Sequence, residues 1–212
     1  MKKKLLMLIM AILTMTVNLH AQKTADELIK QVVDKTRSLK NLKIDFVYKM
    51  INEKAGINET KSGMLYLNDE SYRIELDQQL VISDGTTVWT YLEDSNEVMV
   101  TNAADGDEAM TPSKLLTSYY KDFSSSFVKG REAANKFLKT IELKPKTGKK
   151  FSKMQLTVDE QKLQLLNLSI FDNGGNTFYY DLSKMTPDSK IAGDFFQFNP
   201  KKYPGVEVVD MR

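Results

Sequence analysis

The stretch Gln79-Leu80-Val81-Ile82-Ser83-Asp84-Gly85-Thr86-Thr87-Val88-Trp89-Thr90-Tyr91-Leu92 decides the fold class of this chain of 212 residues. It holds two short runs rich in β-branched and aromatic residues, the types that favour strands. Asp84-Gly85 stands between the runs, and this dipeptide between apolar segments is a strong signal for a tight hairpin. The stretch therefore predicts two strands, 79–83 and 86–92, joined by a turn.

The same pattern extends in both directions from this hairpin. Apolar side chains alternate from Leu42 to Met50, which is the period of a strand with one wetter face. The segment 103–131 interrupts the series, and Pro112 suits the first turn of a short helix over 112–120. Strands at this spacing with one helical interruption predict an antiparallel sheet or open barrel. The other expected strands are 60–67, 72–77, 97–102, 137–144, 151–159, 163–172, 176–183, 195–199 and 206–210.

One amphipathic helix is expected before the first strand. Thr24-Ala25-Asp26-Glu27 has the capping-box pattern, in which Thr24 bonds the amide of Glu27 and Glu27 reaches back. Behind this box, apolar residues recur at helical spacing with charged residues between them. We predict a helix from Thr24 to about Lys40. Its apolar stripe holds Leu28, Ile29, Val32, Val33 and Leu39.

The first 21 residues have the features of an export signal. Three lysines, Lys2 to Lys4, precede an apolar run from Leu5 to Val17, and a small residue, Ala21, stands at the expected cleavage site. The run is too short to span a bilayer comfortably. We therefore expect a signal peptide at 1–21, a single domain at 22–212 and a location in a bacterial periplasm.

Charge and residue types exclude several classes of function. Without the three lysines of the signal, 27 basic and 28 acidic residues remain, and a formal charge of −1 gives no reason to expect nucleic acid. The chain has no cysteine, and its one histidine, His20, lies in the signal. Catalysis that needs histidine or cysteine, Cys/His zinc sites and disulfides are excluded. We expect no metal and no cofactor.

Acidic residues offer two alternative sites. Asp84 and Asp94 have the residue type of the paired carboxylates in glycosidases, but both stand where turns favour aspartate. Asp105, Asp107 and Glu108 offer oxygen ligands for Ca²⁺, yet they lack the ligand spacing of a calcium loop. Turn residues and a solvated loop are the favoured interpretations. A hydrolase that uses Asp84 and Asp94 is the alternative from the enzyme class.

Apolar residues are more abundant on the expected strands than a few helices can cover. Nine tyrosines, ten phenylalanines and one tryptophan are accompanied by methionines, which adapt to varied apolar shapes. This supply fits either a ligand-sized cavity or an ordinary core. With a period of two, Trp89 and Tyr91 share one face of their strand, whereas Val88 and Leu92 share the other. Both faces are partly apolar.

Three segments, taken together, resemble one known family. The first is Ser83 to Leu92 of the hairpin quoted above, with its continuation Asn96-Glu97-Val98-Met99-Val100. The second is Gly63-Met64-Leu65-Tyr66-Leu67 followed by Tyr72-Arg73-Ile74-Glu75. The third is Phe196-Gln197-Phe198-Asn199-Pro200 followed by Gly205-Val206-Glu207-Val208-Val209-Asp210. In this order, the segments resemble the LolA family of periplasmic carriers of outer-membrane lipoproteins.

The resemblance implies a mainly β fold with a few helices, an unclosed antiparallel β-barrel that encloses a hydrophobic cavity under a helical lid. It implies a non-enzymatic chaperone, expected to be a monomer, that binds acyl chains and carries lipoproteins from the inner to the outer membrane. The implied partners are acylated lipoproteins, an inner-membrane transporter that releases them and an outer-membrane acceptor. The residues expected to line cavity and lid are Ile29, Val33, Leu65, Leu67, Tyr72, Ile74, Trp89, Tyr91, Leu115, Leu116, Tyr119, Phe196 and Phe198.

One feature departs from the family pattern. Well-known members carry an Arg-Pro pair directly after the strand that matches 63–67, and that arginine is linked to lid closure. Asn68-Asp69-Glu70 stands there in this chain, so the role of the arginine does not carry over. A module of the same fold that binds another lipid or glycolipid, or that senses a signal, is the alternative function.

Overall fold

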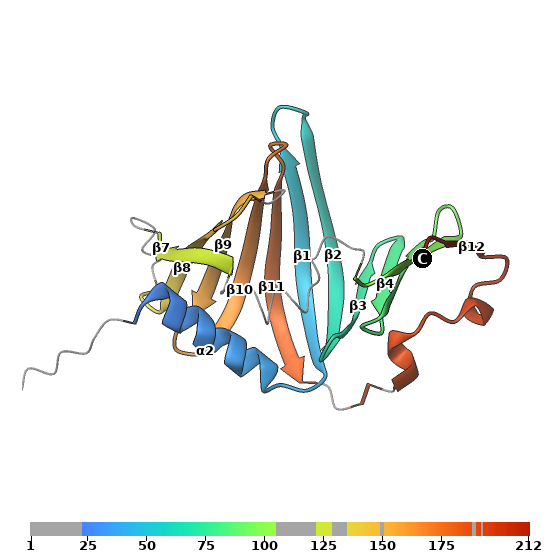
Figure 1. Cartoon of the computed structure of the whole chain (residues 1–212), viewed down its shortest axis with the longest axis horizontal. Helices are drawn as coiled ribbons and strands as arrows, with labels where there is room; N and C mark the ends of the chain where they lie inside the picture. The colour runs from blue at the N-terminus through green and yellow to red at the C-terminus, as the bar shows by residue number, and fades with distance from the viewer. Residues whose placement is uncertain (1–22, 105–121, 129–134, 149–150, 188–189, 192) are drawn as a thin grey trace, which may run out of the picture.

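The structure, a computed structural model, describes residues 23–104, 122–128, 135–148, 151–187, 190–191 and 193–212. Within these residues, twelve strands form one sheet in the order β12-β6-β5-β4-β3-β2-β1-β11-β10-β9-β8-β7. The outermost strands, β12 and β7, do not pair with each other in the described part, so the sheet is open (Figure 1). The prediction of a mainly β, unclosed architecture is therefore confirmed.

Neighbouring strands are antiparallel at every position of the sheet but one. The exception is β12, which runs parallel to β6, with Val208 opposite Val98. The predicted antiparallel sheet thus gains one parallel strand at its edge. The described elements are α2 (Ala25–Arg37), β1 (Leu42–Asn52), β2 (Ile57–Asn68), β3 (Ser71–Leu76), β4 (Gln79–Ser83), β5 (Thr87–Leu92), β6 (Glu97–Asn102), β7 (Phe123–Phe127), β8 (Leu138–Pro145), β9 (Phe151–Asp159), β10 (Gln164–Asp172), β11 (Thr177–Pro187), η2 (Gly193–Phe196), η3 (Pro200–Lys202) and β12 (Glu207–Asp210).

Helix α2 begins where the capping box predicts. The hydroxyl of Thr24 accepts the amide of Glu27 at 3.2 Å, and the carboxylate of Glu27 accepts the amide of Thr24 at 2.8 Å. The helix ends at Arg37 with Ser38 as its C-cap, short of the predicted Lys40. Four residues of its predicted apolar stripe, Leu28, Ile29, Val32 and Val33, are buried, and they fix the face that α2 turns toward the sheet.

Two segments differ from their predictions. Residues 195–199, predicted as a strand, form part of η2 and of the connection to η3. Pro200 has no amide for a ladder, and the side chain of Asn199 accepts the amide of Lys201 at 3.1 Å, which favours a turn. Strand β7 lies inside the predicted interruption, because its sequence Phe-Ser-Ser-Ser-Phe carries only two apolar residues to show a period.

Three predictions fall on residues outside the described ranges. These are the signal peptide at 1–21, the helix over 112–120 and the acidic group at 105–108. In the part of the chain that the structure describes, no helix combines the length and apolar character needed to cross a membrane. The single domain over 22–212 stays a prediction.

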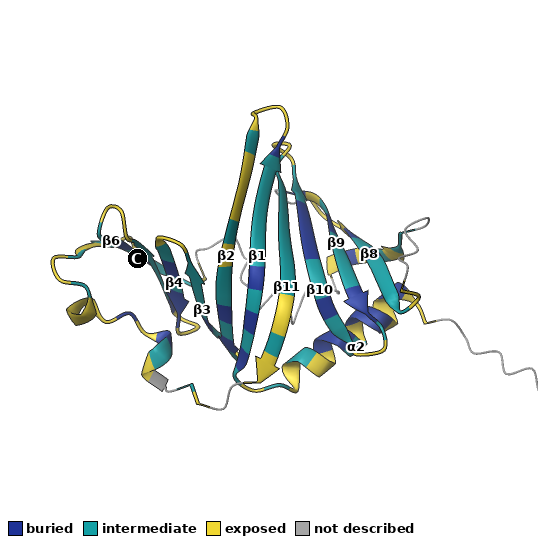
Figure 2. Cartoon of the chain, turned by 180° about the vertical axis from the view of Figure 1, so that it is seen from behind, coloured by how far each residue is buried: buried dark blue, intermediate teal, exposed yellow. Residues whose placement is uncertain are grey.

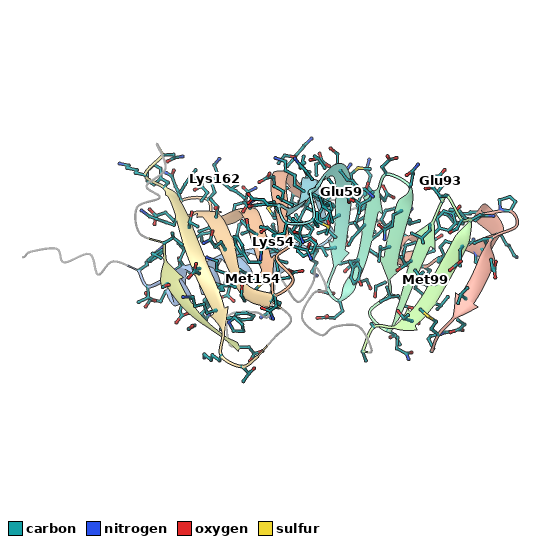
Figure 3. All side chains as sticks on the ribbon, turned by 90° about the horizontal axis from the view of Figure 1, so that it is seen from above. Lys54, Glu59, Glu93, Met99, Met154 and Lys162 are labelled. Carbon is teal, nitrogen blue, oxygen red and sulfur yellow. The ribbon has the colours of Figure 1, made fainter. Side chains whose placement is uncertain are left out.

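The sheet is curved, and different segments cover its two faces (Figures 1 and 3). We call the side on which α2 lies against β7 and β10 the inner face, and the side on which η2 lies against β3 the outer face. Tyr66 contacts Phe195 of η2, whereas its neighbours Leu65 and Leu67 belong to the buried cluster of α2. Because adjacent strand residues point to opposite sides, the two covers lie on opposite faces.

Candidate functional site

The inner face carries a continuous apolar surface that crosses the sheet. Cross-strand pairs place Ile44, Leu65 and Ile74 in one row over β1, β2 and β3. The row joins the buried stripe of α2 in one cluster that also takes in β7 to β10. Met154 of β9, labelled in Figure 3, is 1% exposed within this cluster. Most of the apolar core of the described chain therefore lies between α2 and the inner face.

Half-buried apolar side chains border this cluster on the inner face. They pack against the buried residues but keep part of their surface accessible, unlike the side chains directly beneath α2. A surface of this kind is where an apolar ligand gains contact without a large rearrangement of the core. The bordering residues are Leu39, Tyr48, Ile74, Leu76, Val81, Phe127, Leu156, Leu163, Phe178, Tyr180, Leu182 and Met185.

Three aromatic rings on β1 and β11 belong to this border, and the buried ring of Phe46 lies next to them. The ring centroids of Tyr48 and Tyr180 lie 5.4 Å apart, and Tyr48 and Phe178 are stacked at 6.4 Å. Phe46 contacts Tyr180 at 6.3 Å. Burial raises the pKa of Tyr180 to about 12, so its phenol is neutral at any physiological pH. The rings offer an apolar surface with hydroxyl groups at its edge.

Polarity rises along the inner face beyond these rings. Lys61 lies opposite Tyr48. Two residues further along the β1–β2 ladder, Glu59 lies opposite Met50. Burial, and then the negative charge of Glu59, raise the pKa of Tyr48. The inner face thus passes from a dry floor at Ile44 to a charged rim at Lys61 and Glu59.

Gly63 lies on β2 between the apolar floor and the charged rim. Gly63 lies opposite Phe46, and a Cβ at Gly63 would stand 2.8 Å from the Phe46 ring, 2.8 Å from Leu76 Cδ2 and 2.7 Å from the Glu75 carbonyl oxygen. No side chain fits there without moving a backbone carbonyl. Gly63 therefore lets the tip of the Phe46 ring approach the backbone of β2.

Six of the residues predicted for cavity and lid meet on the inner face. Ile29 and Val33 are 4% and 6% exposed on α2, and they share their cluster with residues of β2 and β3. Those strand residues are Leu65, Leu67, Tyr72 and Ile74. Leu115, Leu116 and Tyr119, predicted for the same lid, lie outside the described residues.

The remaining predicted residues lie elsewhere. Trp89 and Tyr91 pair with Ile82 and Leu80 on β4, and all four belong to a second cluster with Phe198. The ring of Tyr203 contacts Tyr91 at 4.5 Å and Phe198 at 4.7 Å, which places this cluster on the outer face beneath the C-terminal segment. Phe196 of η2 is also buried, next to Phe195.

Arg73 holds the C-terminal segment to the outer face. Its Nε donates to Glu75 Oε1 at 2.6 Å, and its guanidinium lies 4.7 Å from the centroid of the Phe195 ring. A cleft of about 280 Å³ lies beside this contact and is lined by Arg73, Ile82, Lys190, Asp194, Phe195, Gln197, Phe198, Asn199, Lys202 and Tyr203. Arg73 thus points away from the face that α2 covers.

Some inner-face residues were not predicted from the sequence. Phe46, Tyr48, Phe178 and Tyr180 stand on strands that the period of two identified, but the pattern alone does not tell which strands become neighbours. Asp84, the candidate carboxylate, has the predicted turn role, because its Oδ1 accepts the amides of Thr86 at 2.9 Å and Thr87 at 2.8 Å. Asp94 lies exposed in the turn between β5 and β6.

The chain matches the family model described as outer membrane lipoprotein carrier protein LolA over residues 37–199. The outer-membrane lipoprotein carrier protein of Legionella pneumophila (strain Lens) is 29% identical over 133 residues, which span 62% of this chain and 63% of that protein. The protein of the same name in Xylella fastidiosa (strain 9a5c) is 26% identical over 181 residues, 84% of this chain and 85% of that protein.

A solved structure supports the fold independently of sequence. An uncharacterized conserved protein from Thermus thermophilus aligns with a TM-score of 0.51 at 13% identity, covering 86% of this chain and 96% of that one. The family match covers most of the elements described above, from the end of α2 through η2. The chain therefore belongs to the LolA family of outer membrane lipoprotein carrier proteins.

Proposed function

We propose that this protein is a periplasmic chaperone that carries lipoproteins from the inner to the outer membrane with their acyl chains on the inner face. The observation that carries the proposal is the half-buried apolar border around the cluster of α2. Membership of the LolA family supports the same cargo. The export signal predicted at 1–21 supports the compartment.

The energetics of the cargo match this surface. Each CH₂ group transferred from water to an apolar site gains about 0.8 kcal/mol, so one long acyl chain gains on the order of 10 kcal/mol. A carrier has to cover most of this surface and still release it to an acceptor. A helix such as α2, which covers the inner face with a single apolar stripe, provides a cover that opens at moderate cost.

The proposed partners follow from this cargo. An inner-membrane transporter hands over the lipoprotein, and an outer-membrane acceptor takes it. The turn between β2 and β3, Asn68 to Ser71, holds Asp69 with φ of +50° and carries no Arg-Pro pair. We therefore propose that the cover of this protein is held by the apolar stripe of α2 rather than by an arginine in this turn.

The direct test is to add a synthetic triacylated peptide and to measure the complex by native mass spectrometry. We expect one peptide per chain, with binding weakened at least tenfold by Ile29→Glu or Val33→Glu, because each places a charge in the buried stripe. Lys35→Glu, on the exposed side of the same helix, is the matched control. Circular dichroism must show an intact sheet in each variant.

Two results would contradict the proposal. One is the absence of a complex with the wild-type chain at peptide concentrations well above those that saturate a carrier. The other is equal affinity of Ile29→Glu, Val33→Glu and Lys35→Glu for the peptide. In the second case acyl chains bind elsewhere, and a lipid-binding module that uses another surface becomes the better description.

A further inference from the structure

Half of strand β2 has an unpaired edge. The strand runs from Ile57 to Asn68 and pairs with β1 along its whole length. On its other side, β3 pairs only with residues from Gly63 to Asn68. Among the described strands, none pairs with the outer edge of 57–62, and most of this part of β2 is exposed (Figure 2).

This edge is regular enough to accept another strand. The β1–β2 register runs without a shift from Leu67 opposite Leu42 to Ile57 opposite Asn52. Residues 57–62 contain no proline and no glycine, and Thr60 and Ser62 are exposed. Edges of this kind are usually blocked by proline, bulges or lysine, and here only Lys61 plays such a part.

The unpaired half of β11 shows the contrast. Strand β10 pairs with β11 only up to Asp181, so residues 182–187 also lack a described neighbour on that side. This stretch carries Lys184 and ends in Pro187. Its pairing with β1 is also irregular, because the register shifts between Asp45 and Phe46. Its edge is therefore protected by three features, whereas the edge of β2 is nearly open.

The open edge is continuous with the apolar surface of the inner face. Lys61 and Glu59 form the charged rim above Tyr48, and both belong to the unpaired half of β2. A ligand whose acyl chains lie on the floor at Ile44 and Phe46 leaves the inner face at this rim. Its polar part then passes directly along 57–62.

We propose that the peptide following the acylated cysteine of a cargo lipoprotein adds to the outer edge of 57–62 as an extended strand. This proposal rests on the proposed function, since it requires acyl chains on the inner face. Strand addition uses main-chain hydrogen bonds, which every peptide offers. The edge therefore recognises cargo without reading its sequence, as a carrier of many lipoproteins requires.

The dimensions of the edge fit a short linker. Six strand residues span roughly 20 Å, enough for a similar number of cargo residues. Each main-chain hydrogen bond adds little net free energy, so most of the affinity stays with the acyl chains. The added strand instead fixes where the cargo polypeptide leaves the carrier.

Cysteine cross-linking tests this arrangement, because the chain contains no cysteine of its own. Thr60→Cys places one thiol on the edge, and a triacylated peptide carries one free cysteine that is moved by one residue at a time. We expect the disulfide yield to rise and fall with a period of two, since alternate residues of an added strand face the same side. Asn58→Cys must give the same period with its maximum moved by two residues.

Thr186→Cys on the protected half of β11 is the matched control, because it is also an exposed threonine on an unpaired strand half. We expect it to link weakly and without a period. Yields at Thr60→Cys that lack the period, or that equal those at Thr186→Cys, overturn the proposal if mass spectrometry shows the peptide bound. Absence of the bound peptide overturns the proposed function instead.

Discussion

Trp89 is a single residue whose side chain lies on the outer face of the sheet, opposite the face that α2 covers. The β4–β5 register places it opposite Ile82, on the outer face with Phe198 and away from the stripe of α2. Phe178 stands on the inner face, stacked on Tyr48. These two positions therefore report on opposite sides of the same sheet.

A pair of single-tryptophan proteins tests which side binds acyl chains. Quenching by a brominated fatty acid needs near contact, so we expect saturable quenching in Trp89→Phe/Phe178→Trp, and little in the wild-type protein, whose one tryptophan is Trp89. A fluorescence titration at equal ligand occupancy measures the quenching in the variant and in the wild-type protein. Strong quenching of Trp89 alone would instead support the sequence-based prediction that Trp89 and Tyr91 line the cavity.

The alternation of residues could be predicted from the sequence, whereas the choice of face could not. The period of two correctly separates Trp89 and Tyr91 from Val88 and Leu92. Which side receives α2 depends on segments far away in the chain, since Leu80 and Ile82 are covered by Phe198. The contact of Phe198 with Leu80 and Ile82 joins residues more than one hundred positions apart, and no local pattern in the sequence predicts it.

At the level of elements, α2 is the described segment best placed to uncover the inner face. Its first turn is fixed by the capping box, and Ser125 on β7 donates to Asp26 Oδ1 at 2.5 Å. The Ser125–Asp26 hydrogen bond ties its N-terminal end to β7 at the edge of the sheet, while the buried stripe packs along its length. Opening of the cover therefore requires loss of both.

Thr24→Ala tests the contribution of the cap. Removal of an N-cap hydroxyl costs about 1 kcal/mol of helix stability, so we expect the free energy of unfolding to fall by about that amount. Hydrogen exchange should accelerate in the first turns of α2 more than in β1 or β10. Thr86→Ala, in an exposed turn, is the control. Unchanged exchange in α2 would show that the capping box does not stabilise the first turns of the helix.

Elements with local signals could be predicted, and elements that depend on distant partners could not. The capping box and stripe predict α2, and Asp84-Gly85 predicts the β4–β5 hairpin. Strand β7 has few apolar residues and is recognisable only through its pairing with β8. The segment 195–199 has the composition of a strand, but Asn199 and Pro200 begin a turn that lays its rings on the outer face.

In the molecule as a whole, the C-terminal segment returns to the sheet and covers the face opposite α2. The amide of Glu207 donates to the Asn96 carbonyl at 2.9 Å, and the amide of Met211 donates to the Val100 carbonyl at 2.9 Å, which ties β12 to β6. Phe198 and Tyr203 then close the second cluster. The two covers lie on opposite faces of one sheet, so we expect each to change without the other.

Phe198→Ala tests this independence. Phe198 is 8% exposed, and removal of a buried phenylalanine ring costs about 3 kcal/mol, so we expect a clear loss of thermal stability. The affinity for a triacylated peptide should stay within twofold of wild type at a temperature where both proteins are folded, because the ring lies on the other face from α2. Val208→Ala, at a side chain that is 52% exposed on β12, is the control and should change neither property. If Phe198→Ala weakens peptide binding tenfold while the sheet remains folded, the outer face takes part in binding, as the family resemblance predicts for Phe196 and Phe198.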